Sequence, residues 1–394
     1  MNKLNEFAAL LQTCAHPAQW VSGKYPVLIY GAGNTGWGAM AILKAQGIEI
    51  AGFLDAQAKP GQHLAGLPVS TLSDWLSKHD PTHYEVLIAI ANPILLPQIL
   101  ELRQQMTVHG FAKCSHDLYK LEFTPLFLKD PVLCRFENTK QYYKHVLPEL
   151  SRLDALLADE ESRQCLMNYV RMHCEERETQ YYNATDHYRP SGLPTWPQPL
   201  RFIDGGAYTG DTLADFSQHG YLFEAIAAFE PDPENFQRLV SNSTIYENII
   251  CFPCALGSET KNVRFDASGT TAAYVTEKGA QSIQCVALDD VLRGFRPNLI
   301  KMDIEGAEPE ALMGAKDMIT RHRPHLAICL YHQLEHLWRI PLLLDEWQLG
   351  YRFYLRQHAP VCELVLYAYP DERPGFVQQT SATLGEPCND GPSQ

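Results

Sequence analysis

The stretch from Phe202 to Thr212 carries the residue types that a ligand-binding turn needs. It reads FIDGGAYTGDT, which is a short apolar entry, an acid and three glycines within six residues. Glycine adopts positive φ and lets a ligand approach the backbone closely, so the pattern predicts a buried strand that breaks into a tight turn before a helix. In an open α/β sheet small molecules bind at this edge. An ordinary Gly-rich turn is the alternative interpretation.

Charge indicates which ligand suits this turn. Asp204 precedes the glycines, where a carboxylate repels a pyrophosphate and attracts a cationic group. Glu230 ends the next predicted strand and can accept both hydroxyls of a ribose. S-adenosyl-L-methionine has an ammonium, a sulfonium and a ribose, and fits these charges better than NAD. We predict it as the cofactor, bound by Asp204, Gly205, Gly206, Ala207, Gly210, Asp211, Thr212, Glu230 and Pro231.

Further acidic residues and a histidine follow two later strands and indicate transfer to a hydroxyl group. Asp303, Glu305 and Glu308 lie within six residues after a predicted strand, and His332 follows the next strand. We predict Asp303, Glu305 and His332 as catalytic residues. Glu305 would fix the acceptor or the cofactor, and Asp303 or a histidine of ordinary pKa near 6.5 would take the proton. In the alternative, Glu308 caps a helix and Lys301 pairs with an acid.

Two short motifs are typical of metal sites, but we do not predict a metal at either. His332, Glu335 and His336 spell H-x-x-E-H, the zinc signature of one class of hydrolase. Because His332 directly follows a strand instead of lying within a long helix, we predict no metal and keep a zinc hydrolase as the weakest alternative. Cys251 and Cys254 form a single C-x-x-C without a second pair, which favours buried thiols.

The elements that position these residues alternate between strands and helices. Regular alternation predicts a mostly parallel, doubly wound α/β sheet. The last two strands have no helix between them and predict an antiparallel hairpin. The predicted strands span residues 202–204, 225–230, 249–253, 299–303, 325–330, 351–355 and 363–369.

A second Gly-rich turn lies near the N-terminus. Gly31, Gly33 and Gly36 follow a buried strand over residues 27–30 and precede a helix over residues 37–46, and Asp55 lies 22 positions after Gly33. Strand, GxGxxG, helix, strand and terminal acid form the dinucleotide-binding fingerprint in its required context. We therefore predict a second nucleotide site at Gly31, Gly33, Gly36 and Asp55. No catalytic acid–base pair is found beside it.

Length and patterning predict several units. We expect an α/β domain over residues 1–120, a helical linker and lid over 121–200, a second α/β domain over 201–370 and a disordered tail over 371–394. Helical spacing over residues 149–174 is broken by an acidic patch near Asp159. Tyr182 is predicted either to pack or to contact a substrate from a lid, and the Pro/Gly-rich stretch 190–199 is predicted to be a covering loop.

Composition excludes some partners. The net charge of −14 argues against nucleic acid or an anionic membrane as the main partner. We find no signal peptide and no apolar run of the ~20 residues that span a bilayer. The eleven cysteines are scattered, which favours reduced thiols and a cytoplasmic location. Whether the chain forms a homo-oligomer is left open.

From about residue 140 to 370 the chain resembles the FkbM family of S-adenosylmethionine-dependent methyltransferases. The resemblance implies the seven-stranded class I methyltransferase fold and methylation of hydroxyl groups on a sugar, glycan or related small molecule. The matching blocks are residues 157–163, 202–212, 229–231, 255–257, 300–308, 331–332 and 337–341.

The N-terminal unit resembles the Rossmann-like domain of bacterial sugar-modifying acetyltransferases. That resemblance implies either binding of a nucleotide-linked sugar or a structural role. A protein that binds S-adenosylmethionine or a nucleotide-sugar without catalysis is the main alternative function, and a redox enzyme that uses the N-terminal unit is another.

Overall fold

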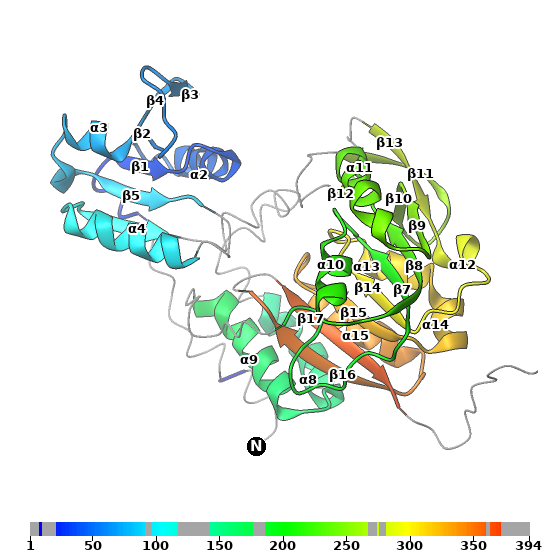
Figure 1. The fold of residues 1–394 in the computed structure, drawn as a ribbon. Helices are drawn as coiled ribbons and strands as arrows, with labels where there is room; N and C mark the ends of the chain where they lie inside the picture. The colour runs from blue at the N-terminus through cyan, green and yellow to red at the C-terminus, as the bar shows by residue number, and fades with distance from the viewer. Residues whose placement is uncertain are drawn as a thin grey trace, which may run out of the picture.

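The computed structural model describes residues 8–9, 21–90, 96–116, 142–175, 186–266, 274–275, 281–359 and 363–371 (Figure 1). Tyr182 and residues 372–394 of the predicted tail lie outside this set. Two sheets dominate the described part: a six-stranded sheet in the N-terminal half and a seven-stranded sheet in the C-terminal half. The predicted α/β class is therefore confirmed.

The N-terminal sheet has the strand order β3-β4-β2-β1-β5-β6. The pairs of β1 with β2 and β5, of β2 with β4, and of β5 with β6 are parallel, as expected for βαβ units. Its strands and helices are β1 (Val27–Tyr30), α2 (Asn34–Ala45), β2 (Ile50–Leu54), β3 (His63–Leu64), β4 (Leu67–Ser70), α3 (Leu72–Leu76), β5 (Glu85–Ile88), α4 (Leu96–Val108) and β6 (Lys113–His116).

Successive residues of β1 point to opposite faces of this sheet, and both faces are covered. Val27 and Ile29 share one apolar cluster with Leu43 of α2. Leu28 belongs to a different cluster that also contains Ile99 of α4. Because β1 is buried on both faces, it consists entirely of large apolar residues, which is the pattern that predicted it.

Two helices connect the sheets in sequence. The predicted break in the helical segment is confirmed, since α8 (Leu147–Leu156) ends just before the acidic patch and α9 (Glu160–Glu175) begins within it. Asp159 accepts a hydrogen bond from the backbone N–H of Ser162 at 2.8 Å, which caps the start of α9.

The seven-stranded sheet has the order β16-β17-β15-β14-β7-β8-β9. All its neighbours are parallel except β17, which runs antiparallel to both β15 and β16. Its strands are β7 (Leu200–Gly205), β8 (Phe223–Phe229), β9 (Ile249–Phe252), β14 (Leu299–Met302), β15 (His325–Cys329), β16 (Tyr351–Gln357) and β17 (Leu364–Pro370).

Helices cover both faces of this sheet. The apolar side chains on one face of the sheet form a single buried cluster with Phe216 of α10 (Asp211–Gln218) and Leu239 of α11 (Pro233–Asn242). The other face shares a cluster with residues of α8, α13 (Glu308–Met313), α14 (Lys316–His322) and α15 (His336–Glu346). The carboxyl ends of β7, β8, β14 and β15 consequently meet at one edge, where the predicted site residues lie.

A second, four-stranded sheet in this half was not predicted. Its order is β10-β13-β11-β12, from β10 (Cys254–Leu256), β11 (Lys261–Asp266), β12 (Tyr274–Val275) and β13 (Gln281–Val286).

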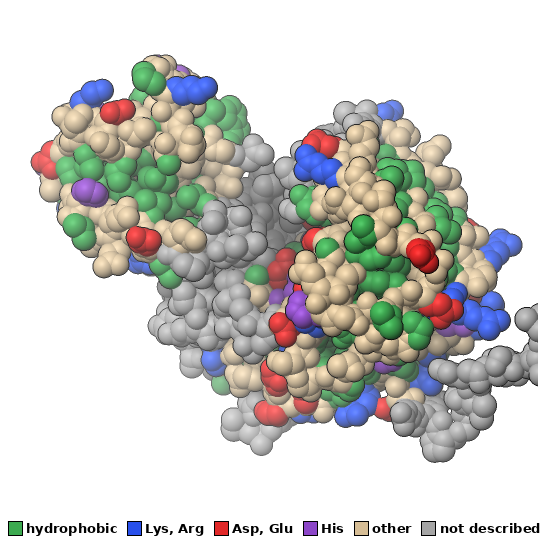
Figure 2. Space-filling view, viewed as in Figure 1, with side chains coloured by type: hydrophobic (Ala, Val, Ile, Leu, Met, Phe, Trp, Pro, Cys, Tyr) green, Lys and Arg blue, Asp and Glu red, His purple; other side chains and the backbone are tan. Residues whose placement is uncertain are grey.

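In the space-filling view, Lys and Arg side chains form small separate groups on the visible face, which agrees with the net charge of −14 (Figure 2). No helix among the described residues has the length and apolar character needed to cross a membrane.

Candidate active site

The Gly-rich turn after β7 follows a backbone path that only glycine permits. Gly206 has φ of +73°, and a Cβ there would lie 1.8 Å from the backbone oxygen of Asp303. Gly210, with φ of +88°, precedes α10. Tyr208 between them also adopts positive φ, at +48°. The turn is thus packed directly against the end of β14, which leaves its other side for a ligand.

The predicted ribose-binding acid lies against this turn. Glu230 follows β8, and its Oε2 accepts a hydrogen bond from the Tyr208 N–H at 2.9 Å. Its Oε1 accepts one from the Asp232 N–H, also at 2.9 Å. Burial raises the pKa of Glu230 to about 7. Each oxygen keeps a lone pair after these bonds, so the carboxylate can still accept a hydroxyl.

The other predicted cofactor residues differ in exposure. Asp204 is fully buried, and its Oδ1 lies 3.1 Å from Nζ of Lys301. Burial raises the pKa of Asp204 to about 6, although Lys301 opposes the shift. Ala207 and Thr212 are buried, whereas Asp211 is exposed. A direct contact between Asp204 and a cofactor stays a prediction; in this structure its carboxylate is covered and faces Lys301.

Asp303 lies at the same sheet edge, one strand from the turn, and its carboxylate is held by two phenols. Tyr188 donates its hydroxyl to Oδ2 at 3.0 Å, and Tyr331 donates to Oδ1 at 3.1 Å. Burial alone would raise the pKa of Asp303, but Lys301 and His332 outweigh it, and the net shift is downward. The Asp303 side chain remains 22% exposed, so an acceptor can reach it.

His332 is enclosed by carboxylates. Its Nε2 lies 3.3 Å from Asp303 and 3.6 Å from Glu305, while its Nδ1 lies 2.8 Å from Glu308. Burial alone would lower the pKa of His332, but Glu308 and Glu305 outweigh it and raise the pKa to about 10. The surrounding carboxylates favour the protonated ring, which argues against the predicted role of His332 as the proton acceptor near neutral pH.

Glu305 and Glu308 differ although they are three residues apart. Glu305 is 21% exposed, has φ of +56°, and burial raises its pKa to about 8. Glu308 is fully buried and accepts hydrogen bonds from the N–H groups of Ile304 and Gly306. The alternative interpretation is correct for Lys301, which pairs with Asp204, but wrong for Glu308, because no side-chain hydrogen bond caps α13 and Glu308 instead holds the segment before it.

The H-x-x-E-H residues do not converge on one point. His332 precedes α15 and His336 is its first residue, and both face Glu308, with His336 Nδ1 at 3.3 Å. Glu335 instead pairs with Arg339 at 2.6 Å. Within the described ranges, no group of three or more His, Cys, Asp or Glu side chains is arranged to hold a metal ion.

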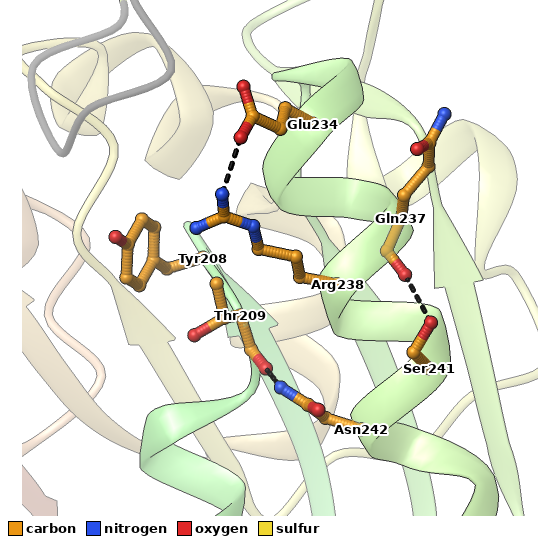
Figure 3. Close-up of a pocket in the computed structure, with 7 residues that line it drawn as sticks. All are labelled: Tyr208, Thr209, Glu234, Gln237, Arg238, Ser241 and Asn242. Atoms are coloured by element: carbon orange, nitrogen blue, oxygen red, sulfur yellow. Dashed lines mark hydrogen bonds and ion pairs between the residues drawn. The ribbon is translucent and has the colours of Figure 1, made fainter.

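A pocket of about 550 Å³ adjoins the outer side of the Gly-rich turn (Figure 3). The side chain of Asn242 bridges its two walls by donating to the Thr209 carbonyl at 2.8 Å. None of the predicted catalytic residues lines it. The lining residues come from the turn and from one face of α11: Tyr208, Thr209, Glu234, Gln237, Arg238, Ser241 and Asn242.

Comparison with known proteins finds a family model that matches the segment around this site. Residues 204–353 match the model of the methyltransferase FkbM domain. This segment is therefore similar to the methyltransferase FkbM domain, and residues 204–353 are named the FkbM domain after that match. It contains Gly205 to Thr212 of the turn, Glu230, Asp303 and His332, so the predicted family is confirmed over residues 204–353, whereas the block 157–163 lies outside the match.

Two relatives give further context. The hexuronic acid methyltransferase AglP of Haloferax volcanii is 31% identical over 96 residues, which cover 23% of this chain and only 40% of that protein. The crystal structure of methyltransferase FkbM from Methylobacillus flagellatus KT shares 22% identity and superposes with a TM-score of 0.69, covering 93% of this chain and 99% of that one. At this identity the second match shows a shared fold.

Two residues beside the FkbM domain's catalytic edge were missed from the sequence. Tyr188 lies before β7 and adopts φ of +56°, and its ring stacks on that of His187 at 3.9 Å between centroids. Tyr331 was noted only as the neighbour of His332. The one available signal was the position of Tyr188 beside the predicted covering loop, whose Trp196 donates to the Tyr188 carbonyl at 2.7 Å.

The second Gly-rich turn, outside the FkbM domain, repeats the contact made by Glu230. Asp55 follows β2; its Oδ2 accepts from the Ala32 N–H at 2.9 Å and its Oδ1 from the Gln57 N–H at 2.8 Å. A Cβ on Gly36 would lie 1.9 Å from the Gly31 carbonyl oxygen, so this glycine is required for packing. By contrast, a Cβ on Gly33 would meet no atom within 4 Å.

The position of His332 predicts how stability depends on pH. The pKa of His332 in the folded protein is about 10, above the ordinary 6.5. Its contribution to the unfolding free energy is therefore complete below pH 6.5 and is lost as the pH rises toward 10. Between about pH 6 and pH 10 the wild type should lose at least about 2 kcal/mol more unfolding free energy than His332→Gln. Denaturant titrations at several pH values test this, with His219→Gln, an exposed histidine, as control. Parallel curves for wild type and His332→Gln would contradict it.

Proposed function

We propose that this chain is an S-adenosylmethionine-dependent methyltransferase that methylates a hydroxyl of a sugar, a glycan or a related small molecule. One observation carries the proposal: Glu230 and Asp303 end two strands that flank β7, so a ribose-binding acid and a proton-accepting acid lie on either side of one Gly-rich turn. The FkbM domain match supports the same reaction class.

The residues around the turn fit the proposed cofactor. Glu230 offers two oxygens to the ribose hydroxyls, and positive φ at Gly206 and Gly210 keeps the backbone open to close approach. S-adenosylmethionine, when bound, supplies an electrophilic methyl group. The chain contributes alignment, which is the main requirement of an in-line displacement.

On the acceptor side, Asp303 is the residue that holds the released proton. Tyr188 and Tyr331 fix both of its oxygens, and nearby cations keep it ionised, so it can accept a hydrogen bond from a hydroxyl. Protonated His332 balances the charge of Asp303 and orients both Asp303 and Glu305. We therefore assign His332 a positioning role and keep Asp303 and Glu305 as the groups that touch the acceptor.

A sugar acceptor is favoured by two observations. The AglP relative is named as a hexuronic acid methyltransferase, and Asp303 and Glu305 are each about one-fifth exposed, so paired carboxyl groups are available to bind hydroxyls. The non-catalytic alternative requires only a cofactor site. The non-catalytic alternative does not explain why two buried phenols hold the Asp303 carboxylate at the end of the neighbouring strand.

We further propose that the N-terminal sheet binds a nucleotide or a nucleotide-linked sugar at Gly31, Gly33, Gly36 and Asp55. The observation that favours this is the shared geometry of Asp55 and Glu230, since each accepts the N–H of a Gly-rich turn and the N–H two residues after itself. Gly33 borders open space, where phosphate groups can approach the backbone.

Removal of the Glu230 carboxylate tests the cofactor. In calorimetric titration with S-adenosylmethionine, Glu230→Gln should bind about tenfold more weakly or worse, because one acceptor oxygen becomes an amide donor. Glu224→Gln, an exposed acid near the opposite end of the same strand β8, is the matched control and should bind like wild type. Absence of any binding heat in the wild type would overturn the proposed function.

Removal of the Asp303 charge tests the acceptor side. Asp303→Asn should bind S-adenosylmethionine like wild type, whereas transfer of a labelled methyl group to sugars should fall about 10²–10⁴-fold. The assay uses a panel of neutral hexosides and hexuronides. Equal transfer rates for wild type and Asp303→Asn would show that another group takes the proton.

A larger residue in the N-terminal turn tests the second site. Gly33→Val places its side chain in open space, so folding should be preserved while binding of UDP-N-acetylglucosamine, the probe, is blocked by contact with the phosphates. Gly38→Val, at another glycine of α2 with free space around it, is the control and should still bind. If UDP-N-acetylglucosamine binds neither the wild type nor Gly38→Val, the nucleotide-sugar proposal for this turn fails.

A further inference from the structure

A buried lysine lies directly beneath the cofactor turn and is not used by the proposed chemistry. Lys301 is 3% exposed and belongs to β14, next to β7. In the parallel register it pairs with Asp204 on one side and with Ala327 on the other. The neighbouring positions on this face, Phe202 and Leu299, belong to a purely apolar cluster. A charged residue here therefore requires a reason other than packing.

The contacts of Lys301 are specific. Its Nζ donates to the carbonyl oxygen of Gly206 at 2.6 Å and lies 3.1 Å from Oδ1 of Asp204. The ring of Tyr188 covers it, with Nζ 5.5 Å from the ring centroid. Gly206 is the glycine whose backbone touches Asp303, so one ammonium group holds the turn at the point where the cofactor side meets the acceptor side.

A buried ion pair of this kind adds little net stability. Removing two charges from water costs several kcal/mol per ion, and well-packed apolar residues of similar volume are often equally stable or better. The Lys301–Asp204 pair is thus poorly explained as a stabilising element. Its geometry is better explained by the one contact that no apolar side chain could replace, the hydrogen bond to the Gly206 carbonyl.

We propose that Lys301 is a positioning residue that fixes the Gly-rich turn in its cofactor-binding conformation by holding the Gly206 carbonyl, with Asp204 as its counter-ion. This inference rests on the proposed function. Asp204 then acts on the cofactor through Lys301 and does not need to touch it. Because Lys301 also lies under Tyr188, the same cation supports the phenol that holds Asp303.

A charge-removal series separates positioning from stability. Lys301→Met leaves Asp204 buried and alone, so thermal stability should fall, and S-adenosylmethionine should bind about tenfold more weakly or worse. The double variant Lys301→Met/Asp204→Leu removes both charges without adding a polar group and should recover much of the lost stability. It still supplies no donor to the Gly206 carbonyl, so its affinity should stay about tenfold low.

Arg356→Met is the matched control, because Arg356 is a second buried cation, 3% exposed and paired with Asp159 at 2.7 Å at the start of α9. It should lose stability but keep the affinity within about twofold. The readouts are the unfolding temperature and the calorimetric dissociation constant. Wild-type affinity in the folded double variant would overturn the role of Lys301, even if Lys301→Met itself does not fold. Wild type that fails to bind S-adenosylmethionine would instead refute the proposed function, and this inference with it.

Discussion

The burial of several charges at one sheet edge is the constraint on which this site depends. Lys301, Asp204, Glu308 and His332 are each at most 3% exposed. An isolated charge in such a place is prohibitively costly, so each must face an opposite one. The charges therefore form a connected set in which the removal of any one leaves another uncompensated. These contacts link side chains at the ends of β7, β14 and β15.

The charged residues at this sheet edge are of two kinds, which differ in their exposure to solvent. The fully buried members hold the backbone or another side chain: Lys301 holds the turn and Glu308 holds the segment after β14. The partly exposed members, Asp303 and Glu305, are the ones a substrate can reach. The proposed chemistry thus lies at the rim of this network of buried charges. Asp303 stays ionised because cations lie beneath and beside it, not because it is in water.

The strands and the Gly-rich turns could be predicted because their signals are local. Continuous apolar runs mark strands buried on both faces, and glycines mark turns with positive φ. The partners of Asp303 could not, since Tyr188 is 115 residues away in the sequence and only the folded loop brings its hydroxyl to the carboxylate. The state of His332 was likewise hidden, because it is set by Glu308, which looked like an ordinary helix-capping acid.

The two Gly-rich turns share one feature and differ in another. Asp55 and Glu230 hold their turns in the same way. In the FkbM domain, however, the residue before the first glycine is Asp204, and its register partner is Lys301.

In the N-terminal sheet the corresponding position, directly before Gly31, is Tyr30, and its register partner is Ile88. At these two positions the N-terminal sheet therefore has neither the carboxylate nor the ammonium group of the FkbM domain, and the acid that contacts its turn is Asp55. The same backbone arrangement is therefore compatible with an anionic ligand at the N-terminal turn and with a cationic ligand at the turn of the FkbM domain. The residue in front of the glycines is the difference on which the two proposed ligand classes depend.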